Sequence, residues 1–383
     1  MIFASYSKGQ EEFPRVIHIS VARYRRELPQ PGEALEFLVT VHEEGMGITW
    51  QQNVTVDPAT ETYLVEATND LLLWNVNLAL TTQKARLRAQ ELGQRLYRTF
   101  IGEEGEKILG AIPATSILLD IDETIMNLPW ELISDAQGPL SLETPLGRLV
   151  TTRMILRQGR DPLHEDLVVR ILAIANPTLD LATSEAEIAV LQQLKGKYAS
   201  IPIQVDMLSR QQATRANFKE MLAGNDYDIL HFGGHGFLDR DTPGLSALRL
   251  ADGDLTADEV LNLPWKKPPY FVFNSACESG RGVGGQRLVS AQSQTNGLAA
   301  AFLAAGVYGC AGYFWPVTET GAGIFAEAFY KNLFLRENVG LAFLEARQSA
   351  IRELGEVGDL TGYSAILYGD AASKHRRDLA MAE

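Results

Sequence analysis

The sequence contains very few cysteines and lacks a long hydrophobic run. Its 383 residues include two cysteines, Cys277 and Cys310, too few for a disulfide framework or a cysteine-rich zinc site. No stretch reaches the roughly 20 apolar residues of a membrane-spanning helix, and residues 1–16 lack the apolar centre of a signal peptide. These absences predict a cytoplasmic protein without a membrane partner, in which a free thiol stays reduced and nucleophilic.

Positive charge is also scarce. The chain carries 34 lysine and arginine residues against 48 aspartate and glutamate residues, a formal net charge of -14 at pH 7. Such a surface does not attract a polyanion, so we expect no direct nucleic-acid binding. Hydrophobic residues make up 46% of the chain, which is enough for a large core. Composition therefore predicts a soluble globular protein and leaves its chemistry open.

The apolar pattern predicts the fold class. Residues 1–75 contain partly alternating, β-branched segments and are expected to be β-rich. A helical stripe covers residues 81–100, and beyond residue 117 short apolar runs alternate with helical segments. Two helix starts fit capping boxes, Ser184 with Glu187 and Thr256 with Glu259. This order predicts an α/β protein with a mostly parallel β-sheet flanked by helices on both faces.

A glycine-rich loop with a histidine follows one of the predicted strands. The apolar run 229–232 ends in Gly-Gly-His-Gly, which places His235 between Gly234 and Gly236. Glycine permits positive φ angles and the close approach of a ligand to the backbone. His235 is therefore a candidate functional side chain, whereas His231, inside the apolar run, is interpreted as a core histidine.

A second loop places a thiol at the end of another strand. The run 270–273 leads to Cys277, and four glycines follow within residues 280–285. Functional groups collect where parallel strands end, so a histidine on a neighbouring strand can activate this cysteine. His235 precedes Cys277 by about 40 residues, close to the roughly 50 of caspases. Cys310 lies within an apolar run and is interpreted as structural.

These loops resemble the CHAT domain, a caspase-like branch related to caspases and separases. His-Phe-Gly-Gly-His-Gly, ending at Gly236, is similar to its histidine motif, and Asn-Ser-Ala-Cys-Glu-Ser-Gly, ending at Gly280, to its cysteine motif. Four further segments agree in order with the family pattern: 128–131, 175–177, 312–317 and 365–370. The resemblance covers roughly residues 75 to 370.

The resemblance implies a caspase-like cysteine endopeptidase that needs neither a metal nor a cofactor. Cys277 would attack the scissile carbonyl and form an acyl-enzyme, while His235 would protonate the leaving amine and then activate water. The backbone N–H groups of Gly236 and Cys277 would form the oxyanion hole. The implied substrate is a protein of the same cell, and a sensor or regulatory protein would switch the enzyme on. Bacterial antiviral defence and programmed cell death, with gasdermin-like substrates, are roles that such domains serve.

Substrate specificity departs from the caspase pattern. Ser275 occupies the position of the caspase glutamine, and the segment around Trp315 resembles the caspase substrate strand without its arginine. Strict preference for aspartate at P1, the residue preceding the scissile bond, is therefore not expected. Glu319 and Asp239 are candidates for an acidic pocket that accepts a basic P1 residue, but the simpler interpretation, and the one we prefer, is that both are solvated loop charges.

The resemblance divides the chain into three predicted parts. Residues 1–75 form a β-rich N-terminal region, residues 76–160 the pseudo-caspase-like beginning of the CHAT domain, and residues 161–383 the catalytic part.

Two alternatives belong to other functional classes. A non-catalytic, caspase-like interaction module would have no need for His235 with Cys277. A magnesium-dependent phosphatase of the haloacid dehalogenase type would use Asp120 and Asp122 in the pattern Asp-x-Asp-x-Thr, with a later acidic segment at 253–259. That later segment does not follow a buried strand, and the first motif runs into the CHAT-like segment 128–131.

Overall fold

The computed structural model describes most of the chain, in segments separated by short gaps. These segments are residues 15–24, 30, 32–46, 49–72, 82–111, 114–151, 168–197, 202–239, 243–276, 297–336 and 338–373. Among them, no helix is long and apolar enough to cross a membrane.

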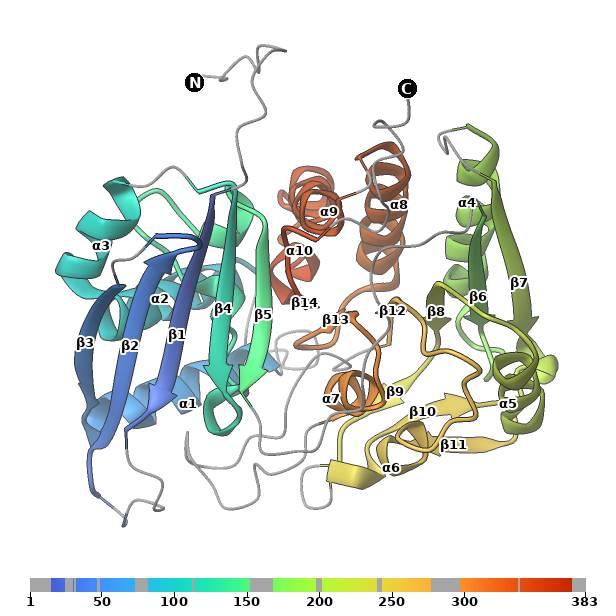
Figure 1. Ribbon diagram of the computed structural model, residues 1–383, viewed down its shortest axis with the longest axis horizontal. Coiled ribbons are helices and arrows are strands. Elements are labelled where there is room, and N and C mark those ends of the chain that lie inside the picture. Colours follow the sequence, from blue (N-terminus) through green and yellow to red (C-terminus); the bar gives the residue numbers. More distant parts are fainter. Residues whose placement is uncertain are drawn as a thin grey trace.

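Eleven strands of the described chain form one continuous sheet (Figure 1). Their order is β3-β2-β1-β4-β5-β14-β13-β12-β8-β6-β7. In chain order their bounds are β1 Val16–Arg23, β2 Leu35–Glu43, β3 Thr49–Val56, β4 Ser116–Asp122, β5 Leu146–Thr151, β6 Val169–Ala175, β7 Ile203–Ser209, β8 Ile229–Gly233, β12 Phe271–Asn274, β13 Gly309–Tyr313 and β14 Ala365–Tyr368. A small second sheet has the order β11-β10-β9, from β9 Gly236–Phe237, β10 Ala247–Leu250 and β11 Gly253–Thr256.

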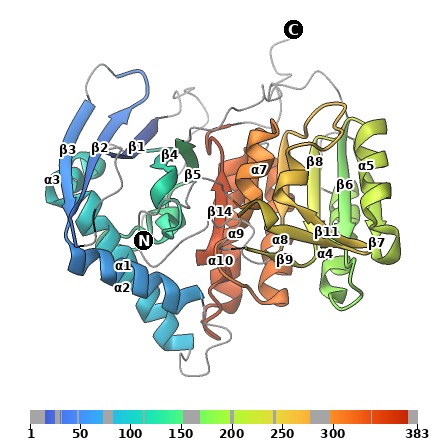
Figure 2. The same ribbon diagram turned by 90° about the horizontal axis from the view of Figure 1, so that it is seen from below.

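The N-terminal half of the large sheet is covered by helices on one face. β2 pairs antiparallel with both β1 and β3. On its other side β1 pairs in parallel with β4, and β4 pairs in parallel with β5. Alternate residues of β2 point inward, with Phe37, Val39 and Val41 buried. These residues share one hydrophobic cluster with residues of the helices α1 Pro58–Leu72, α2 Thr82–Phe100 and α3 Gly102–Ala111. Figure 2 shows these helices along one face of the strands. The β-rich character predicted for the N-terminal region is confirmed by β1 to β3.

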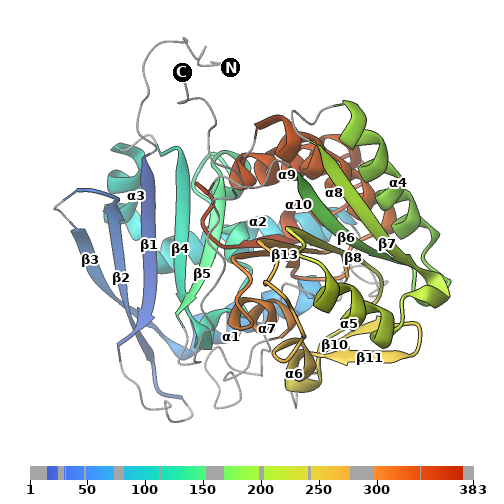
Figure 3. The same ribbon diagram turned by 45° about the vertical axis from the view of Figure 1, so that its right-hand side comes forward.

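The C-terminal half is a parallel sheet with helices on both faces (Figure 3). β7, β6, β8, β12 and β13 are parallel, and β14 closes the half antiparallel to β13. Two buried hydrophobic clusters lie on opposite faces of its strands. The helices are α4 Ala182–Lys197, α5 Arg215–Gly224, α6 Ala257–Val260, α7 Leu298–Ala304, α8 Glu319–Arg336, α9 Val339–Leu354 and α10 Thr361–Ser364. The predicted fold class is therefore confirmed.

One of the two predicted helix caps is correct. Thr256 caps α6, and Glu259 returns the bond to the backbone N–H of Thr256, which completes the capping box. The other prediction is wrong, because α4 already begins at Ala182 and Ser184 lies inside its first turn. The hydroxyl of Ser184 donates to the carbonyl of Leu181 instead.

Short 3₁₀ helices connect β4 to β5 and bring an acidic side chain into the core. They are η1 Glu123–Ile125, η2 Trp130–Leu132 and η3 Leu140–Leu142, with η4 Arg210–Gln212 and η5 Pro243–Leu245 elsewhere. Glu131 of η2 is 1% exposed and forms an ion pair with Arg148 of β5, which is fully buried. Arg148 Nε lies 3.2 Å from Glu131 Oε1, and its Nη1 donates to the carbonyl of Met126 at 2.9 Å.

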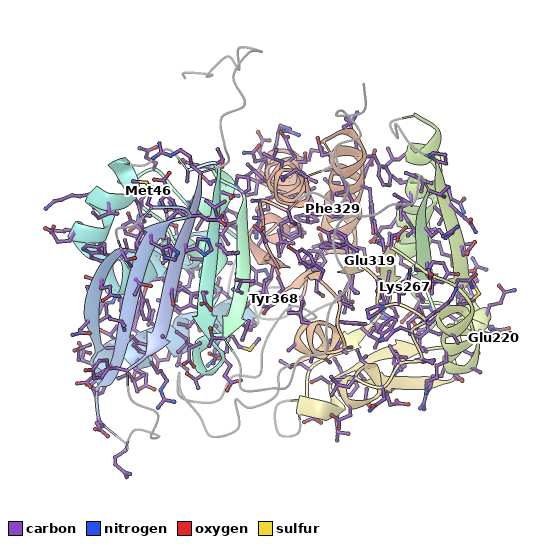
Figure 4. The ribbon with its side chains drawn as sticks, viewed as in Figure 1. Met46, Glu220, Lys267, Glu319, Phe329 and Tyr368 are labelled. Atoms are coloured by element: carbon purple, nitrogen blue, oxygen red, sulfur yellow. The ribbon has the colours of Figure 1, made fainter. Side chains whose placement is uncertain are left out.

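This ion pair lies where the two halves of the sheet meet. Arg148 is the register partner of Tyr368 in β14, and its guanidinium lies 5.5 Å from the centre of the Tyr368 ring. Figure 4 shows Tyr368 beside β5. Arg347 of α9 is also buried and donates to the carbonyl of Gly362 at 3.1 Å. Burial lowers the pKa of Arg347, the charge of Glu131 raises it and the charge of Arg148 lowers it. The junction of β5 with β14, where the two halves of the sheet meet, is called the seam below. At the seam, the Glu131 carboxylate interacts with two buried guanidinium groups, those of Arg148 and Arg347.

Neutralising that carboxylate is expected to destabilise the whole chain. Glu131→Gln leaves two cations buried without a counter-charge, so we expect a loss of about 3–5 kcal/mol in the free energy of unfolding, measured by urea denaturation. The matched control is Glu104→Gln, which breaks the Lys107–Glu104 pair, whose side chains are 67% and 70% exposed. The control is expected to leave the urea midpoint unchanged. Equal effects of the two variants would contradict this assignment.

Candidate active site

Three neighbouring strands deliver the candidate residues to one edge of the sheet. His231 of β8 is in register with Ala173 of β6 and with Phe273 of β12, and all three strands are parallel. The loops that follow β6, β8 and β12 therefore begin at the same edge. The small sheet β11-β10-β9 continues from the loop after β8 and lies along this edge (Figure 1).

His235 stands at this edge with its ring partly in solvent. It links β8 to β9, and its carbonyl accepts from the Arg249 N–H at 2.9 Å. The imidazole is 47% exposed, and its Nε2 lies 3.0 Å from Oδ2 of Asp180. Asp180 follows β6 in the loop that leads to α4. Sequence reasoning did not find this partner, since an aspartate in a loop carries no distinguishing pattern.

The loop after β6 is tightly organised around Asp180. Asn176 has a φ of 46° and Leu179 a φ of 69°, both left-handed conformations that non-glycine residues rarely adopt. The amide oxygen of Asn176 accepts from the N–H of Leu181 at 2.9 Å, which closes the loop. The hydroxyl of Thr178 donates to Asp180 Oδ1. The hydrogen bond from Thr178, followed by that from His235, lowers the pKa of the Asp180 carboxyl.

The glycines before His235 have a steric role. Neither Gly233 nor Gly234 has a positive φ, so close approach of neighbouring atoms, and not a left-handed backbone, is what glycine allows at these two positions. A Cβ on Gly233 would lie 2.9 Å from the Cβ of Ser184, and one on Gly234 would lie 3.2 Å from Pro177. Both residues let the loop after β6 approach the end of β8. This contact brings Asp180 to His235.

A chain of buried polar groups lies beneath the end of β12. Ser275 follows this strand, and its hydroxyl donates to Oε1 of Glu187 at 3.3 Å. Oε2 of the same carboxylate is 3.2 Å from Nε2 of His231, and Nδ1 of His231 is 3.0 Å from the hydroxyl of Tyr330. Burial and the nearby Glu187 raise the pKa of Tyr330. His231 is fully buried, in agreement with its interpretation as a core histidine.

Cys277 and the glycine loop that follows it lie outside the described residues. The chain is described up to Ala276, whose N–H is held by the side chain of Asn274 at 3.2 Å. Cys310 is a free thiol in β13 with 0% exposure, and burial raises its pKa well above that of an ordinary thiol. A buried, protonated Cys310 is a poor nucleophile at neutral pH.

The remaining predicted substrate residues occupy different environments. The Trp315 side chain is fully buried, and the hydroxyl of Ser364 bonds both its N–H and its carbonyl, so its position does not support a side-chain contact with substrate. Glu319 begins α8 and accepts from the Thr183 hydroxyl at 2.5 Å (Figure 4). The N–H of Asp239 donates to the hydroxyl of Ser246 at 3.0 Å, just beyond β9.

The two aspartates of the phosphatase alternative serve local structure. Asp122 caps η1, with its Oδ1 accepting from both the N–H and the hydroxyl of Thr124. Asp120 accepts from the hydroxyl of Thr151 at 2.6 Å. Segment 253–259 forms β11 and the capped start of α6. Within the part of the chain that the structure describes, no three His, Cys, Asp or Glu side chains are grouped as metal ligands.

Comparison with known families agrees with this arrangement. The profile of the CHAT domain matches residues 90–371, about three quarters of the chain. The chain belongs to the CHAT domain family. A search of curated proteins by sequence found no match.

Solved structures with the same fold include caspase-like cysteine proteases. Two crystal structures of the Saccharomyces cerevisiae separase–securin complex match 92% and 93% of this CHAT chain, with TM-scores of 0.55 and 0.61 and 12% identity. The chain spans 30% of the length of that separase. The Arg-specific cysteine proteinase gingipain R, from Porphyromonas gingivalis, has a TM-score of 0.50 and 13% identity to this chain. The match covers 80% of this chain and 74% of the gingipain chain. These likenesses establish the caspase-like fold.

Filling the space at Gly234 is expected to disturb this CHAT site. A Cβ there would lie 2.8 Å from the Phe232 ring, so Gly234→Ala should lower the free energy of unfolding by about 1–3 kcal/mol. It should also weaken the contact between His235 and Asp180. Urea denaturation checks the first effect. Gly224→Ala, where no atom lies within 4 Å of the added Cβ, is the matched control and should not destabilise. A harmless Gly234→Ala would contradict the steric role.

Proposed function

We propose that this chain is a cysteine endopeptidase in which Cys277 is the nucleophile and His235 its general base and acid. One observation carries the proposal: β8 and β12 are hydrogen-bonded parallel neighbours, and His235 follows the end of β8 while Cys277 follows the end of β12 in the sequence. A thiol needs a nearby base or cation to react as a thiolate at neutral pH. The caspase-like fold of the CHAT family supports the same pairing.

The proposed reaction forms and then hydrolyses an acyl-enzyme. The Cys277 thiolate attacks the scissile carbonyl, and His235 gives its proton to the leaving amine as the C–N bond breaks. Water then gives a proton to His235 and attacks the thioester, which releases the acid and restores the thiol. Each positioned proton transfer typically contributes about 10²- to 10⁴-fold in rate.

The register of the small sheet supports Gly236 as an oxyanion donor. In an antiparallel pair, hydrogen-bonded and non-hydrogen-bonded positions alternate. The N–H of Arg249 donates to the carbonyl of His235, so these two residues form a hydrogen-bonded pair. The adjacent pair, Leu248 with Gly236, is then a non-hydrogen-bonded pair. The N–H of Gly236 therefore faces away from β10, on the open side of the small sheet. With the N–H of Cys277, it would receive the negative oxygen of the tetrahedral intermediate.

Acidic side chains around this edge favour a basic P1 residue. Asp180 contacts His235, and Glu319 is joined to Thr183 in the first turn of α4. An acidic P1 side chain would meet like charge here, whereas a lysine or arginine would meet opposite charge.

The separase of known structure is in complex with securin. By analogy, the proposal includes a protein partner that controls the activity of this chain. The proposed substrate is a protein of the same cell, such as a gasdermin-like pore former.

Labelling by a peptide carrying a thiol-reactive ketone tests the catalytic pair. We expect one label per chain, on Cys277, because the Cys310 thiol is buried and protonated. Cys277→Ala should abolish labelling, His235→Ala should slow it by at least about 100-fold, and Cys310→Ala should leave it unchanged. Intact mass and peptide mapping measure these outcomes. Labelling of Cys277 that is as fast in His235→Ala would favour the non-catalytic interaction module.

Peptide cleavage tests the P1 preference separately. Fluorogenic peptides that differ only at P1 should be cleaved with kcat/KM at least about tenfold higher for arginine than for aspartate, a difference of about 1.4 kcal/mol. Glu319→Gln should narrow this ratio by removing one of the negative charges. Equal cleavage of the two peptides would rule out an acidic pocket while leaving the catalytic pair intact.

A further inference from the structure

We propose that Asp180 is the third member of the catalytic group: it holds Nε2–H of His235 and thereby makes Nδ1 the atom that exchanges the proton with Cys277. This inference rests on the proposed function and deepens it. Its basis is the contact between His235 Nε2 and Asp180 Oδ2 at 3.0 Å, across two loops that leave adjacent strands.

The hydrogen-bonding capacity of the two groups assigns the tautomer. An ionised carboxylate only accepts, so Nε2 must carry the hydrogen in this contact. The hydrogen bonds from Thr178 and His235 lower the pKa of Asp180, which keeps the carboxylate ionised at neutral pH. In a neutral imidazole with a hydrogen on Nε2, the lone pair is on Nδ1. The atom available as the base is therefore Nδ1.

The loop that presents Asp180 is held in an unfavourable backbone conformation. Among the described residues, all three non-glycine residues with positive φ are Asn176, Leu179 and Arg210. Glu185 joins two of them: its Oε1 accepts from Asn176 Nδ2 at 2.7 Å, and Arg210 binds both its oxygens. Such conformations persist only where the surroundings hold them, and they concentrate at functional sites. Here they fix the position from which Asp180 reaches the ring.

Structural stabilisation does not account for this pair. The side chains of His235 and Asp180 are 47% and 62% exposed, and an ion pair at such exposure contributes little to folding. Removing the carboxylate should therefore leave the fold intact. Orientation of the imidazole is the consequence that remains.

The proposed proton path is balanced at each step. In the attack, the thiol proton moves to Nδ1, the sulfur electron pair forms the S–C bond, and the carbonyl π pair moves to oxygen. The resulting imidazolium keeps its Nε2–H on Asp180, which remains a carboxylate. As the C–N bond breaks, the proton on Nδ1 passes to the leaving nitrogen. Asp180 touches no reacting atom and acts as a positioning residue.

NMR of the full chain labelled with ¹⁵N-histidine reads the tautomer without requiring turnover. The signals of His235 are identified by their loss in His235→Gln. We expect Nε2 to be protonated and Nδ1 bare in the neutral ring, and Asp180→Ala to mix the two tautomers. Asp254→Asn is the matched control, because it removes a partly exposed carboxylate that pairs with Arg249 instead of with the His235 ring. It should leave the His235 signals unchanged.

Kinetics give the second readout. Asp180→Ala should lower kcat about 10- to 100-fold with little change in KM, by analogy with the loss found when the partner that orients a metal-binding histidine is removed. Asp180→Asn should lower it at least as far, because an amide N–H facing Nε2 favours the wrong tautomer. Asp180→Glu should restore part of the rate, and Asp254→Asn should leave it unchanged.

The outcomes separate this inference from the proposed function. If Asp180→Ala keeps both the His235 tautomer and kcat, the inference is wrong and the His235–Cys277 pair stands. If Cys277→Ala cleaves peptides as fast as the unmodified chain, the proposed function is wrong, and so is the catalytic part of the inference. A changed tautomer together with a reduced kcat in Asp180→Ala, partly recovered in Asp180→Glu, supports both.

Discussion

The buried contact between Glu131 and Arg148 is the interaction on which the joining of the two half-sheets depends. β5 and β14 meet through a single register pair, Arg148 with Tyr368, so the backbone contributes little to the seam. The guanidinium of Arg148 binds the Glu131 carboxylate, backbone carbonyls of the same connection and the face of Tyr368. Arg347 of α9 adds a second buried cation near the same carboxylate. Removing one partner of such a buried ion pair leaves the other charge without a counter-charge, which is strongly destabilising.

The seam is connected to the candidate site through the antiparallel pair β13–β14. Tyr368 ends β14, and Ala365 at its start is in register with Tyr313 at the end of β13. Ser364, immediately before β14, binds the backbone of Phe314 and Trp315 as β13 leaves the sheet. The N-terminal half therefore supports the position of a loop beside the candidate site, although neither His235 nor Cys277 belongs to that half. The N-terminal strands are therefore linked to the candidate site through the shared sheet, and not only through the chain that connects the two halves.

Much of this architecture was predictable from the sequence, because buried parallel strands appear as apolar runs and their ends as glycine-rich loops. His235 was found in this way. Asp180 was not, since its placement depends on left-handed turns at Asn176 and Leu179 that no local pattern reveals. The false cap at Ser184 has a similar cause: Glu187 fits the pattern of a capping box, but its carboxylate turns inward to Ser275 and His231. Tertiary contacts decided both cases.

Two carboxylates at the same edge illustrate how environment assigns roles. Glu187 is buried, and its oxygens lie against Ser275 and His231, so its position is fixed by packing and it has no freedom to follow a reacting group. Asp180 is open to solvent, which makes its ion pair with His235 weak for folding and leaves the carboxylate at the surface of the site. A general base must change its protonation state within each cycle, and a deeply buried partner would resist that change. The exposed Asp180 therefore suits the proposed general base, His235, while the buried Glu187 suits the packing beneath the end of β12.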